Sequence, residues 1–389
     1  MSEKRDFDVI VVGLGAMGSA TLFHLARGGA GVLGLEQYPR GHSAGSSHGD
    51  SRIIRETYFE HPLYVPLVQR AHQLWRELER ITRTSLMTIN GGLMIGPANG
   101  AVVNGTLRSA REHGLPHETL TANEIAARFP AFEPVDGLVG VFDPKAGYLD
   151  PEACVAAHLE AAVRAGATAR FGEAVVAWSA DGHGVEVRTT ETTYTAKRLL
   201  FAAGAWTGAL IPELTLPLTI ERQVVFWLQP DSTSDFDSAR FPIYAYEYKP
   251  GHICYGFPEL RRGVKASVMH SGELANSPAR IRRSVDDDEV EALRAALRPV
   301  LPTLAAAQVR DSDTCLFTNT PDHDFIIDWH PSHPNVLISS PCSGHGFKFS
   351  SAIGELQASL LTGGTADVDI APFRLTRFGR LTGPLGEAK

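Results

Sequence analysis

The stretch DVIVVGLGAMGSATLFHLARGGAGVLGLE, which spans residues 8–36, decides the fold of this chain. Its order of apolar runs and glycines predicts a buried parallel strand, a tight turn, a helix and a second strand. The expected parts are a strand at 8–12, a turn at 13–18, a helix at 16–26 and a strand at 31–35, closed by Glu36. We therefore expect an α/β protein (α+β mixed) with a Rossmann-like dinucleotide-binding domain.

The glycines of this turn follow the spacing G-x-G-x-x-G, and each has a physical task. Gly13 permits the tight turn, Gly15 lets backbone amides approach a pyrophosphate, and Gly18 allows close packing of helix and strand. The helix N-terminus supplies unpaired N–H groups and a partial positive charge for that anion. Glu36 can accept hydrogen bonds from both ribose hydroxyls and would repel a 2′-phosphate. The pattern predicts a bound ADP group, which belongs to either NAD or FAD.

The overall composition restricts the class of protein. The 389 residues suggest about two domains, and 43% hydrophobic with 21% charged residues is typical of a globular protein. A net charge of −8 without basic runs argues against a nucleic-acid partner. No apolar stretch reaches the roughly 18 residues of a membrane span, and the polar start Met1–Arg5 does not resemble a signal peptide. We expect a cytoplasmic protein that has no contact with a membrane.

Cysteines and histidines show no pattern that predicts a metal site. The four cysteines lie far apart without a C-x-x-C pair, so we expect neither a disulfide framework nor a zinc site. The fifteen histidines include no H-E-x-x-H or similar ligand spacing. We therefore expect no bound metal.

The order of elements along the chain indicates an interrupted nucleotide domain. Helices are expected at 63–80, 122–128, 151–165, 286–297 and 347–361, and strands at 91–96, 167–171, 175–178, 185–189, 198–206, 224–228, 253–257, 325–328 and 336–339. Residues 41–50 are rich in glycine and serine, which predicts either a surface loop or backbone packed against a ligand. We assign 1–88, 148–217 and 321–389 to the nucleotide domain, and 89–147 and 218–320 to an inserted, strand-rich substrate domain. NAD dehydrogenases usually keep their dinucleotide fold contiguous, so this interruption favours FAD.

Motifs along nearly the whole chain resemble one family. They lie at 13–18, 46–55, 203–206, 255–258, 263–265, 313–315 and 343–350, and the last, SGHGFKFS, is the most specific. In these motifs the chain resembles the monomeric sarcosine oxidase and N-methyltryptophan oxidase family of FAD-dependent amino acid oxidases.

The resemblance implies FAD held between two domains and oxidation of a carbon–nitrogen bond in a secondary (N-methyl) α-amino acid such as sarcosine. The iminium product would hydrolyse to an aldehyde and an amine, and O₂ would be reduced to H₂O₂. We expect a monomer. Two alternatives stay open: a flavin dehydrogenase of the same fold that uses another acceptor for a cyclic or bulkier amino acid, and a non-catalytic flavin-binding protein.

The resemblance also implies roles for single residues. Cys315 would form a thioether to the flavin 8α position. Arg52 would lie against the flavin, while Arg55 and Lys348 would bind the substrate carboxylate, a task that suits a guanidinium fork. Lys265 would activate oxygen, because a fixed cation stabilises the negative charge that develops on reduction. Without the resemblance, a buried apolar thiol and solvated charges would explain the same residues.

Backbone amides of Gly344, His345, Gly346 and Phe347 would stabilise negative charge on the reduced flavin, whereas a simple helix cap is the plain alternative. The other cofactor contacts that we expect are Ala16, Met17, Ser46, Ser47, His48, Val175, Gly204, Trp206 and Lys348.

Two departures from the family pattern concern the substrate pocket. The family often carries a histidine four residues after the position of Lys265, where this chain has Met269 followed by His270. Adjacent strand residues face opposite sides, so His270 points away from the pocket unless a bulge turns it back. Phe317 replaces a family tyrosine, while Tyr255 remains. We assign catalytic roles to Lys265, Arg52, Tyr255 and His270, and substrate contacts to Arg55, Lys348, Met269 and Phe317.

Overall fold

The strand–turn–helix–strand unit predicted at residues 8–36 is present in the computed structural model, which describes residues 6–366 and 368–379. β1 (Asp6–Val12) runs parallel to β2 (Val32–Glu36), and α1 (Ala16–Arg27) connects them. The turn begins at Gly13, whose φ of +92° is a left-handed conformation that glycine adopts without strain.

This unit belongs to an eight-stranded sheet, the first sheet, that gathers three separate segments of the chain. Its strand order is β10-β11-β12-β1-β2-β9, and β20 joins β12 and pairs with β19. The added strands are β9 (Thr168–Phe171), β10 (Val175–Ala180), β11 (Val185–Thr189), β12 (Thr193–Phe201), β19 (Ile326–His330) and β20 (His333–Ser340). β12 is parallel to both β1 and β20, so the carboxyl ends of these three strands, which come from three separate segments, lie at the same edge of the sheet.

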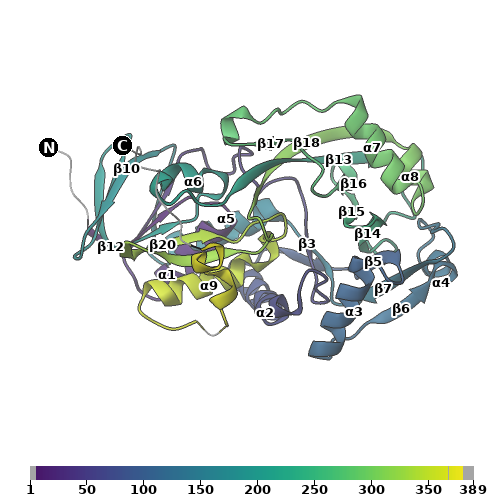
Figure 1. Ribbon diagram of the computed structural model, residues 1–389, viewed down its shortest axis with the longest axis horizontal. Coiled ribbons are helices and arrows are strands. Elements are labelled where there is room, and N and C mark those ends of the chain that lie inside the picture. Colours follow the sequence, from purple (N-terminus) through teal and green to yellow (C-terminus); the bar gives the residue numbers. More distant parts are fainter. Residues whose placement is uncertain (1–5, 367, 380–389) are drawn as a thin grey trace.

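Helices from the beginning, the middle and the end of the described chain pack together beside this sheet (Figure 1). They are α1, α2 (Val65–Thr82), α5 (Pro151–Arg164) and α9 (Ser350–Leu361), and they share one apolar core. The close contact of α9 with α1 depends on Gly354, where an added Cβ would lie 2.6 Å from the backbone carbon of Ala20. The first and last helices thus complete one layer.

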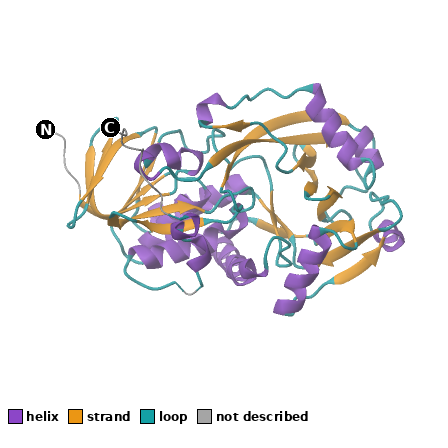
Figure 2. Cartoon of the chain, in the orientation of Figure 1, coloured by secondary structure: helices purple, strands orange, loops and turns teal. Residues whose placement is uncertain are grey.

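A nine-stranded sheet, the second sheet, forms the other half of the molecule (Figures 1 and 2). Its order is β17-β13-β16-β15-β14-β5-β7-β6, with β18 on the other side of β13. The bounds are β5 (Gly92–Pro97), β6 (Glu118–Thr121), β7 (Leu138–Asp143), β13 (Thr219–Gln229), β14 (Ile243–Lys249), β15 (His252–Leu260), β16 (Gly263–Val268), β17 (Leu274–Ala275) and β18 (Gln308–Asn319). Helices α3 (Ala101–His113), α4 (Ala122–Arg128), α7 (Asp287–Leu297) and α8 (Pro302–Ala306) pack in this half.

A small three-stranded sheet and short helical turns connect the halves. The small sheet contains β3 (Arg52–Ile54), β4 (Met87–Ile89) and β8 (Gly147–Leu149). Helix α6 (Thr207–Leu210) follows a 3₁₀ turn at Gly204–Trp206. β3 lies between the two large sheets (Figure 1), and Arg52 is its first residue.

The predicted mixed α/β fold class is confirmed, but several predicted elements differ. The strand expected at 198–206 ends at Phe201, because the chain turns into the 3₁₀ segment that carries Trp206. The helix expected from 347 begins as a 3₁₀ turn, Phe347–Phe349, before α9. Helix α3 and strand β18 are not among the predicted elements. Helix α3 contains Gly105, a residue that is unfavourable within a helix but is required here, because a Cβ would lie 2.1 Å from the carbonyl oxygen of Phe59.

Within residues 6–366 and 368–379, the helices lack the combination of length and apolar composition that a membrane crossing requires. The segment Met1–Arg5, used above to judge the start of the chain, lies outside the described residues. In the described part of the chain, no group of three or more His, Cys, Asp or Glu side chains is arranged to hold a metal. All four cysteines are free.

Candidate active site

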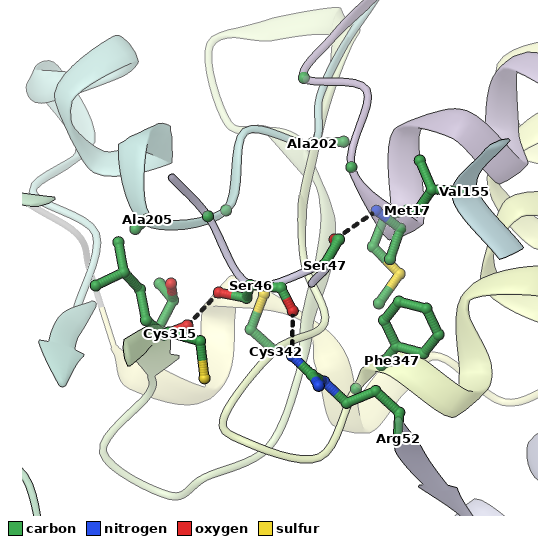
Figure 3. A pocket seen from close by; sticks show the side chains of 18 of the residues that line it. Met17, Ser46, Ser47, Arg52, Val155, Ala202, Ala205, Cys315, Cys342 and Phe347 are labelled. Carbon is green, nitrogen blue, oxygen red and sulfur yellow. Dashed lines mark hydrogen bonds between the residues drawn. The ribbon is translucent and has the colours of Figure 1, made fainter. Parts of the chain in front are cut away.

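A cavity of about 580 Å³ extends from the carboxyl end of β1 to the second sheet. One end is lined by turn residues 13–17 and Glu36, and the other end by Lys265, Met269 and Phe317. Figure 3 shows the side chains between them, among which are Met17, Ser46, Ser47, Arg52, Cys315, Cys342 and Phe347. Residues 12–17 and residues more than 300 positions later in the chain therefore line one cavity.

The glycine turn is packed too closely for side chains. A Cβ on Gly18 would lie 1.8 Å from the carbonyl oxygen of Gly13, and a Cβ on Gly15 would lie 3.2 Å from Ser47 Oγ. Ser47 Oγ accepts a hydrogen bond of 3.1 Å from the backbone N–H of Ala16 at the start of α1. Gly18 therefore acts through helix–strand packing, as predicted, and does not line the cavity.

Glu36 is buried at the end of β2 with its carboxylate held by backbone donors. Oε2 accepts from the Leu14 N–H at 3.0 Å, and Oε1 accepts from the Tyr38 N–H at 3.0 Å. Burial would raise the pKa of Glu36, but hydrogen bonds from His42, Leu14 and Tyr38 outweigh it and lower this pKa. An ionised carboxylate thus lines this end of the cavity.

The serine-rich segment 41–50 crosses between the two halves and is tied to β18. Ser46 Oγ donates to the carbonyl oxygen of Leu316, and the carbonyl oxygen of Ser46 accepts from Arg52 at 2.8 Å (Figure 3). Residues 41, 42 and 45–47 of this segment line the cavity, while Gly41, Ser43 and Ser46 are also exposed, so the segment combines features of the two predicted alternatives.

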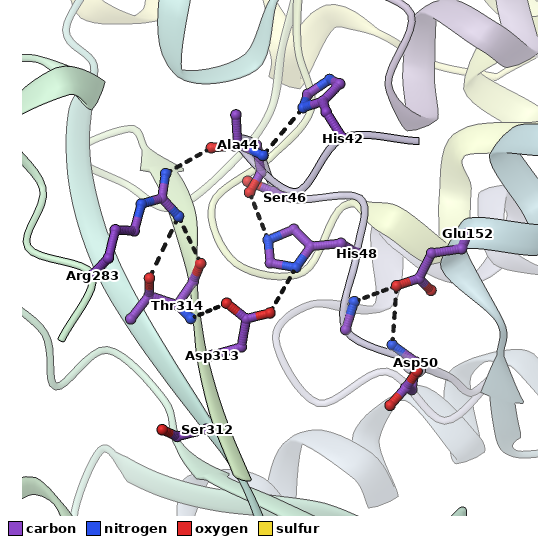
Figure 4. A network of polar contacts seen from close by, with 12 residues as sticks. His42, Ala44, Ser46, His48, Asp50, Glu152, Arg283, Ser312, Asp313 and Thr314 are labelled. Carbon is purple, nitrogen blue, oxygen red and sulfur yellow. Dashed lines mark hydrogen bonds and ion pairs between the residues drawn. The ribbon is translucent and has the colours of Figure 1, made fainter. Parts of the chain in front are cut away.

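A polar network on the outer side of this segment fixes it further (Figure 4). His48 Nε2 lies 3.1 Å from the carbonyl oxygen of Gly45, and Nδ1 lies 3.4 Å from Asp313 Oδ2. Arg283 donates to the carbonyl oxygens of Thr314 at 2.8 Å and Ala44 at 2.9 Å. His48, predicted as a cofactor contact, therefore holds the segment from behind and does not line the cavity. Sequence reasoning missed Arg283, since its partners lie far away in the chain.

Cys315 lies on β18 with its side chain buried against the cavity. Burial raises the pKa of its thiol, while the cations Arg52 and Lys265 oppose that rise. Arg52 also donates to the carbonyl oxygen of Ser51 at 2.7 Å, and its guanidinium lies 5.9 Å from the ring of Phe347. The predicted flavin contacts Arg52 and Phe347 therefore line the cavity together with Cys315.

Lys265 is a buried amine that donates to uncharged oxygens. Its Nζ donates to the carbonyl oxygens of Gly49 at 2.6 Å and Ser51 at 3.0 Å, and lies 4.9 Å from the ring centre of Phe257. Burial lowers the pKa of Lys265 well below its usual range, and the nearby Arg52 lowers it further. A buried amine of this kind, at the cavity wall, is typical of functional positions.

Arg55 and Lys348 are brought together at one place in the cavity, as the resemblance implied. The Arg55 guanidinium lies 4.3 Å from the ring centre of Tyr58 and 4.0 Å from that of Phe59. It donates to Glu60 Oε2 at 2.6 Å. Glu60 also lines the cavity, and it was not among the predicted site residues. Its position five residues after Arg55 is the feature of the sequence that could have indicated an ion pair with that arginine.

Lys348 belongs to a hydrogen-bond chain that passes through Tyr58. Its Nζ donates to the carbonyl oxygen of His345 at 2.6 Å and to the Tyr58 hydroxyl at 3.4 Å. The Tyr58 hydroxyl lies 2.5 Å from His345 Nδ1, and His345 Nε2 lies 2.9 Å from the carbonyl oxygen of His323. Burial lowers the pKa of His345 to about 4 and that of Lys348 to about 7, the latter with help from Arg55. His345 is thus neutral at pH 7, with Nε2 as its donor.

The two glycines of the SGHGFKFS motif are required by close packing. Gly344 has a φ of +77°, and a Cβ there would lie 2.8 Å from the ring of Phe317. A Cβ on Gly346 would lie 1.7 Å from the carbonyl oxygen of Pro341. These positions bring the backbone of 344–348 to the cavity wall, where its amides can face a ligand.

His270 is the predicted catalytic residue that the structure does not bring into the cavity. Its φ of +52° is left-handed, so the alternation of a strand ends at this point. Met269 lines the cavity, whereas the His270 ring lies behind Phe317, with 5.3 Å between ring centres. The remaining predicted residues that line the cavity are Gly13, Gly15, Ala16, Met17, Glu36, Ser46, Ser47, Val175, Gly204, Trp206, Tyr255, Gly344, His345 and Gly346.

Comparison with known proteins gives a consistent result. Residues 8–360 match the family described as FAD dependent oxidoreductase. The chain is 44% identical over 366 residues to a monomeric sarcosine oxidase from Streptomyces avermitilis, covering 92% of this chain and 95% of that protein. It is 36% identical over 377 residues to an N-methyl-L-tryptophan oxidase from Yersinia pestis, covering 96% of this chain and 100% of that protein.

Two solved structures share the fold. NikD, described as an unusual amino acid oxidase essential for nikkomycin biosynthesis, matches with a TM-score of 0.83 at 24% identity, over 99% of this chain and 100% of its own. Glycine oxidase from Geobacillus kaustophilus matches with a TM-score of 0.79 at 21% identity, over 96% of this chain and 99% of its own. At this level of identity the likeness supports the fold alone.

Proposed function

Because this chain belongs to the FAD-dependent oxidoreductase family, alongside the sarcosine and N-methyltryptophan oxidases, we propose that it oxidises secondary (N-methyl) α-amino acids and uses O₂ as electron acceptor. The products would be an imine that hydrolyses to aldehyde and amine, together with H₂O₂. The observation that carries this proposal is the placement of Arg55 and Lys348 in the same cavity as the glycine turn. A cofactor and a carboxylate substrate would thus meet in one enclosed space.

The residues present fit FAD. A cavity of about 580 Å³ is large and elongated enough to enclose most of a dinucleotide, and its narrow turn excludes side chains at Gly13 and Gly18. The start of α1 would receive the pyrophosphate, and Glu36 would accept from the ribose hydroxyls. The backbone at 344–348 and the side chains Arg52 and Lys265 would surround the flavin end.

When bound, FAD supplies the two-electron acceptor that the substrate carbon–nitrogen bond requires. Arg55 and Lys348 would hold the substrate carboxylate and so fix the orientation of the amine relative to the cofactor. Tyr58 and Phe59 pack around Arg55 and keep its guanidinium in place. Tyr255 lines the cavity, and burial raises the pKa of its hydroxyl to about 12, so it would serve as a neutral donor.

Lys265 would supply positive charge where oxygen is reduced. Its Nζ is fixed by the carbonyl oxygens of Gly49 and Ser51, so no reorganisation is needed when negative charge develops beside it. Burial and Arg52 lower the pKa of Lys265, whereas Asp50 and Glu152 raise it, so negative charge that develops in the cavity would likewise favour the ammonium form.

We also propose that Cys315 would form the thioether to the flavin 8α position; the S–H bond and one 8α C–H bond would be lost, and the two electrons released would pass by way of the flavin to O₂, giving H₂O₂. The thiol is buried in the cavity wall, where burial raises its pKa and the nearby Arg52 and Lys265 oppose that rise. The proposed domain division assigns 1–88, 148–217 and 321–389 to FAD binding, and 89–147 and 218–320 to the substrate side. We further propose a monomer that works in the cytoplasm.

A peroxide-coupled assay of the purified yellow protein tests the proposed activity. Sarcosine, N-methyl-L-tryptophan, proline, pipecolate and primary amino acids are offered in air, and we expect peroxide with the secondary amino acids. Anaerobic bleaching of the flavin without peroxide in air would indicate a dehydrogenase instead. Failure of every amine to bleach the flavin would indicate a binding protein without turnover.

A further inference from the structure

The cavity has an apolar wall that consists of the side chains of Ile253, Met269 and Phe317. The backbone N–H of Met269 donates to the carbonyl oxygen of Ile253 at 2.8 Å, so these two residues are fixed side by side. Phe317 reaches the same cavity from β18. The wall therefore combines residues that follow or belong to three different strands.

A buried acid lies behind this wall. Glu221 on β13 is 4% exposed, and its Oε2 accepts from His270 Nδ1 at 2.9 Å and from Asn319 Nδ2 at 2.6 Å. Its Oε1 accepts from the backbone N–H of Gly272 at 3.3 Å. Glu221 thus binds both sides of the turn that follows Met269.

His270 connects Glu221 to residues that line the cavity. Its ring centre lies 5.3 Å from that of Phe317, and its Cε1 lies 3.2 Å from the position of a Cβ on Gly344. On its other side the ring of His323 lies 4.7 Å away, and the carbonyl oxygen of His323 meets His345 Nε2. A polar cluster of buried Glu221, half-buried His270 and exposed His323 therefore contacts Phe317 and the backbone of residues 344–345.

We infer that the apolar wall selects a secondary α-amino acid with a hydrocarbon side chain, and that the Glu221–His270 pair is the positioning device that holds this wall. The inference rests on the proposed function. Sarcosine has no side chain, so it would leave Ile253, Met269 and Phe317 facing water, whereas a branched aliphatic chain would bury them. One methylene in an apolar pocket is worth about 10- to 200-fold in discrimination.

The substrate preference is tested with matched pairs in the peroxide assay. We expect kcat/KM for N-methyl-L-leucine to exceed that for sarcosine at least about tenfold. N-methyl-L-valine should likewise be preferred over N-methyl-L-threonine, which has the same shape but places a hydroxyl against the wall. Equal values, or a preference for sarcosine or the threonine derivative, would overturn the selection of a hydrocarbon side chain.

The role of the Glu221–His270 pair is tested with His270→Gly and His270→Asn. Both residues tolerate the left-handed backbone, but only asparagine keeps a side-chain donor for Glu221. We expect His270→Gly to lower the leucine-to-sarcosine ratio of kcat/KM about tenfold, and His270→Asn to keep this ratio within about threefold. A merely structural defect would lower both kcat/KM values in proportion, and an unchanged ratio in His270→Gly would overturn the positioning role.

A binding measurement separates this inference from the proposed function. Acetate and 4-methylpentanoate carry no oxidisable amine, and their binding to the holoprotein is followed by the change in flavin absorbance. We expect 4-methylpentanoate to bind at least about tenfold more tightly, a difference that requires no turnover. If no amine is oxidised but this difference persists, the proposed function fails while the apolar subsite stands. Equal affinities would overturn the apolar subsite.

Discussion

Glu60 accepts a hydrogen bond of 2.6 Å from the guanidinium of Arg55, so the end of the cavity that we propose to bind the substrate carboxylate already contains one carboxylate. Burial would raise the pKa of Glu60, but Arg55, His345 and Lys348 outweigh it and lower this pKa. Glu60 is therefore ionised, and we expect it to compete with a carboxylate ligand for Arg55.

Replacing Glu60 by glutamine should strengthen the binding of carboxylates. The amide keeps the shape and one acceptor but removes the competing charge, so we expect acetate to bind about tenfold more tightly, or about 1.4 kcal/mol. The flavin absorbance change on titration measures this affinity. Arg55→Gln is the matched comparison and should weaken acetate binding. Weaker binding in Glu60→Gln would mean that Glu60 positions Arg55 and does not compete for it.

Lys348 should make carboxylate binding depend on pH near neutrality. Because its pKa is lowered to about 7, the side chain is an ammonium below this pH and a neutral amine above it. Acetate stays ionised above pH 6, so its Kd should rise as the pH increases through 7, by at most about tenfold per pH unit. Lys348→Arg remains charged and should show a flat profile. A flat profile in the unchanged protein would remove Lys348 from the carboxylate site.

The close packing at Gly18 makes a prediction about cofactor retention. An alanine there would place its Cβ 1.8 Å from the carbonyl oxygen of Gly13, and backbone cannot yield as a flexible side chain does. We expect Gly18→Ala to lose FAD and to lower the free energy of unfolding by at least about 3 kcal/mol. Gly28→Ala is the control, since its Cβ would meet its neighbours at 3.4 Å. Flavin content per protein and urea unfolding measure both effects.

The nucleotide-binding unit was predictable because its signals are local. Apolar strand residues, closely spaced glycines and the closing Glu36 all lie within residues 8–36, and each constrains its neighbours directly. Strand β18 was not predictable in the same way, because its first residues are polar and partly exposed. It is a strand because it pairs along its length with β13, a contact between distant segments.

The residues of the site likewise divide into those indicated by local sequence and those that depend on contacts between distant segments. Motif residues such as Lys265 and Lys348 could be placed from sequence, since each belongs to a recognisable stretch. Glu221 could not be placed from sequence, because its contact with the site runs through a hydrogen bond to His270, which lies 49 positions later. The position of His270 itself depends on a left-handed φ, and a pattern of alternating strand residues contains no information about such a turn.

Lys265 should affect the reaction with oxygen more than the oxidation of substrate. Lys265→Met keeps the length of the side chain but removes the charge that the carbonyl oxygens of Gly49 and Ser51 hold in place. We expect flavin reoxidation by O₂ to slow at least about 100-fold, comparable to the loss of one preorganised electrostatic contact. Anaerobic flavin reduction by substrate should change much less. Stopped-flow absorbance measures the two half-reactions separately, and equal slowing of both would contradict an oxygen-specific role.

Cys315 and Cys342 both line the cavity, so they offer a matched pair for testing the covalent link. Burial raises the pKa of Cys342 to about 11, whereas Arg52 and Lys265 oppose the corresponding rise at Cys315. Cys315 is therefore the thiol that more readily becomes a nucleophile. After acid precipitation, the yellow colour should stay in the pellet of the unchanged protein and of Cys342→Ala, but move to the supernatant for Cys315→Ala. Colour in the supernatant of the unchanged protein would show that FAD is bound without a covalent bond. If colour moves to the supernatant for Cys342→Ala but not for Cys315→Ala, the covalent bond belongs to Cys342.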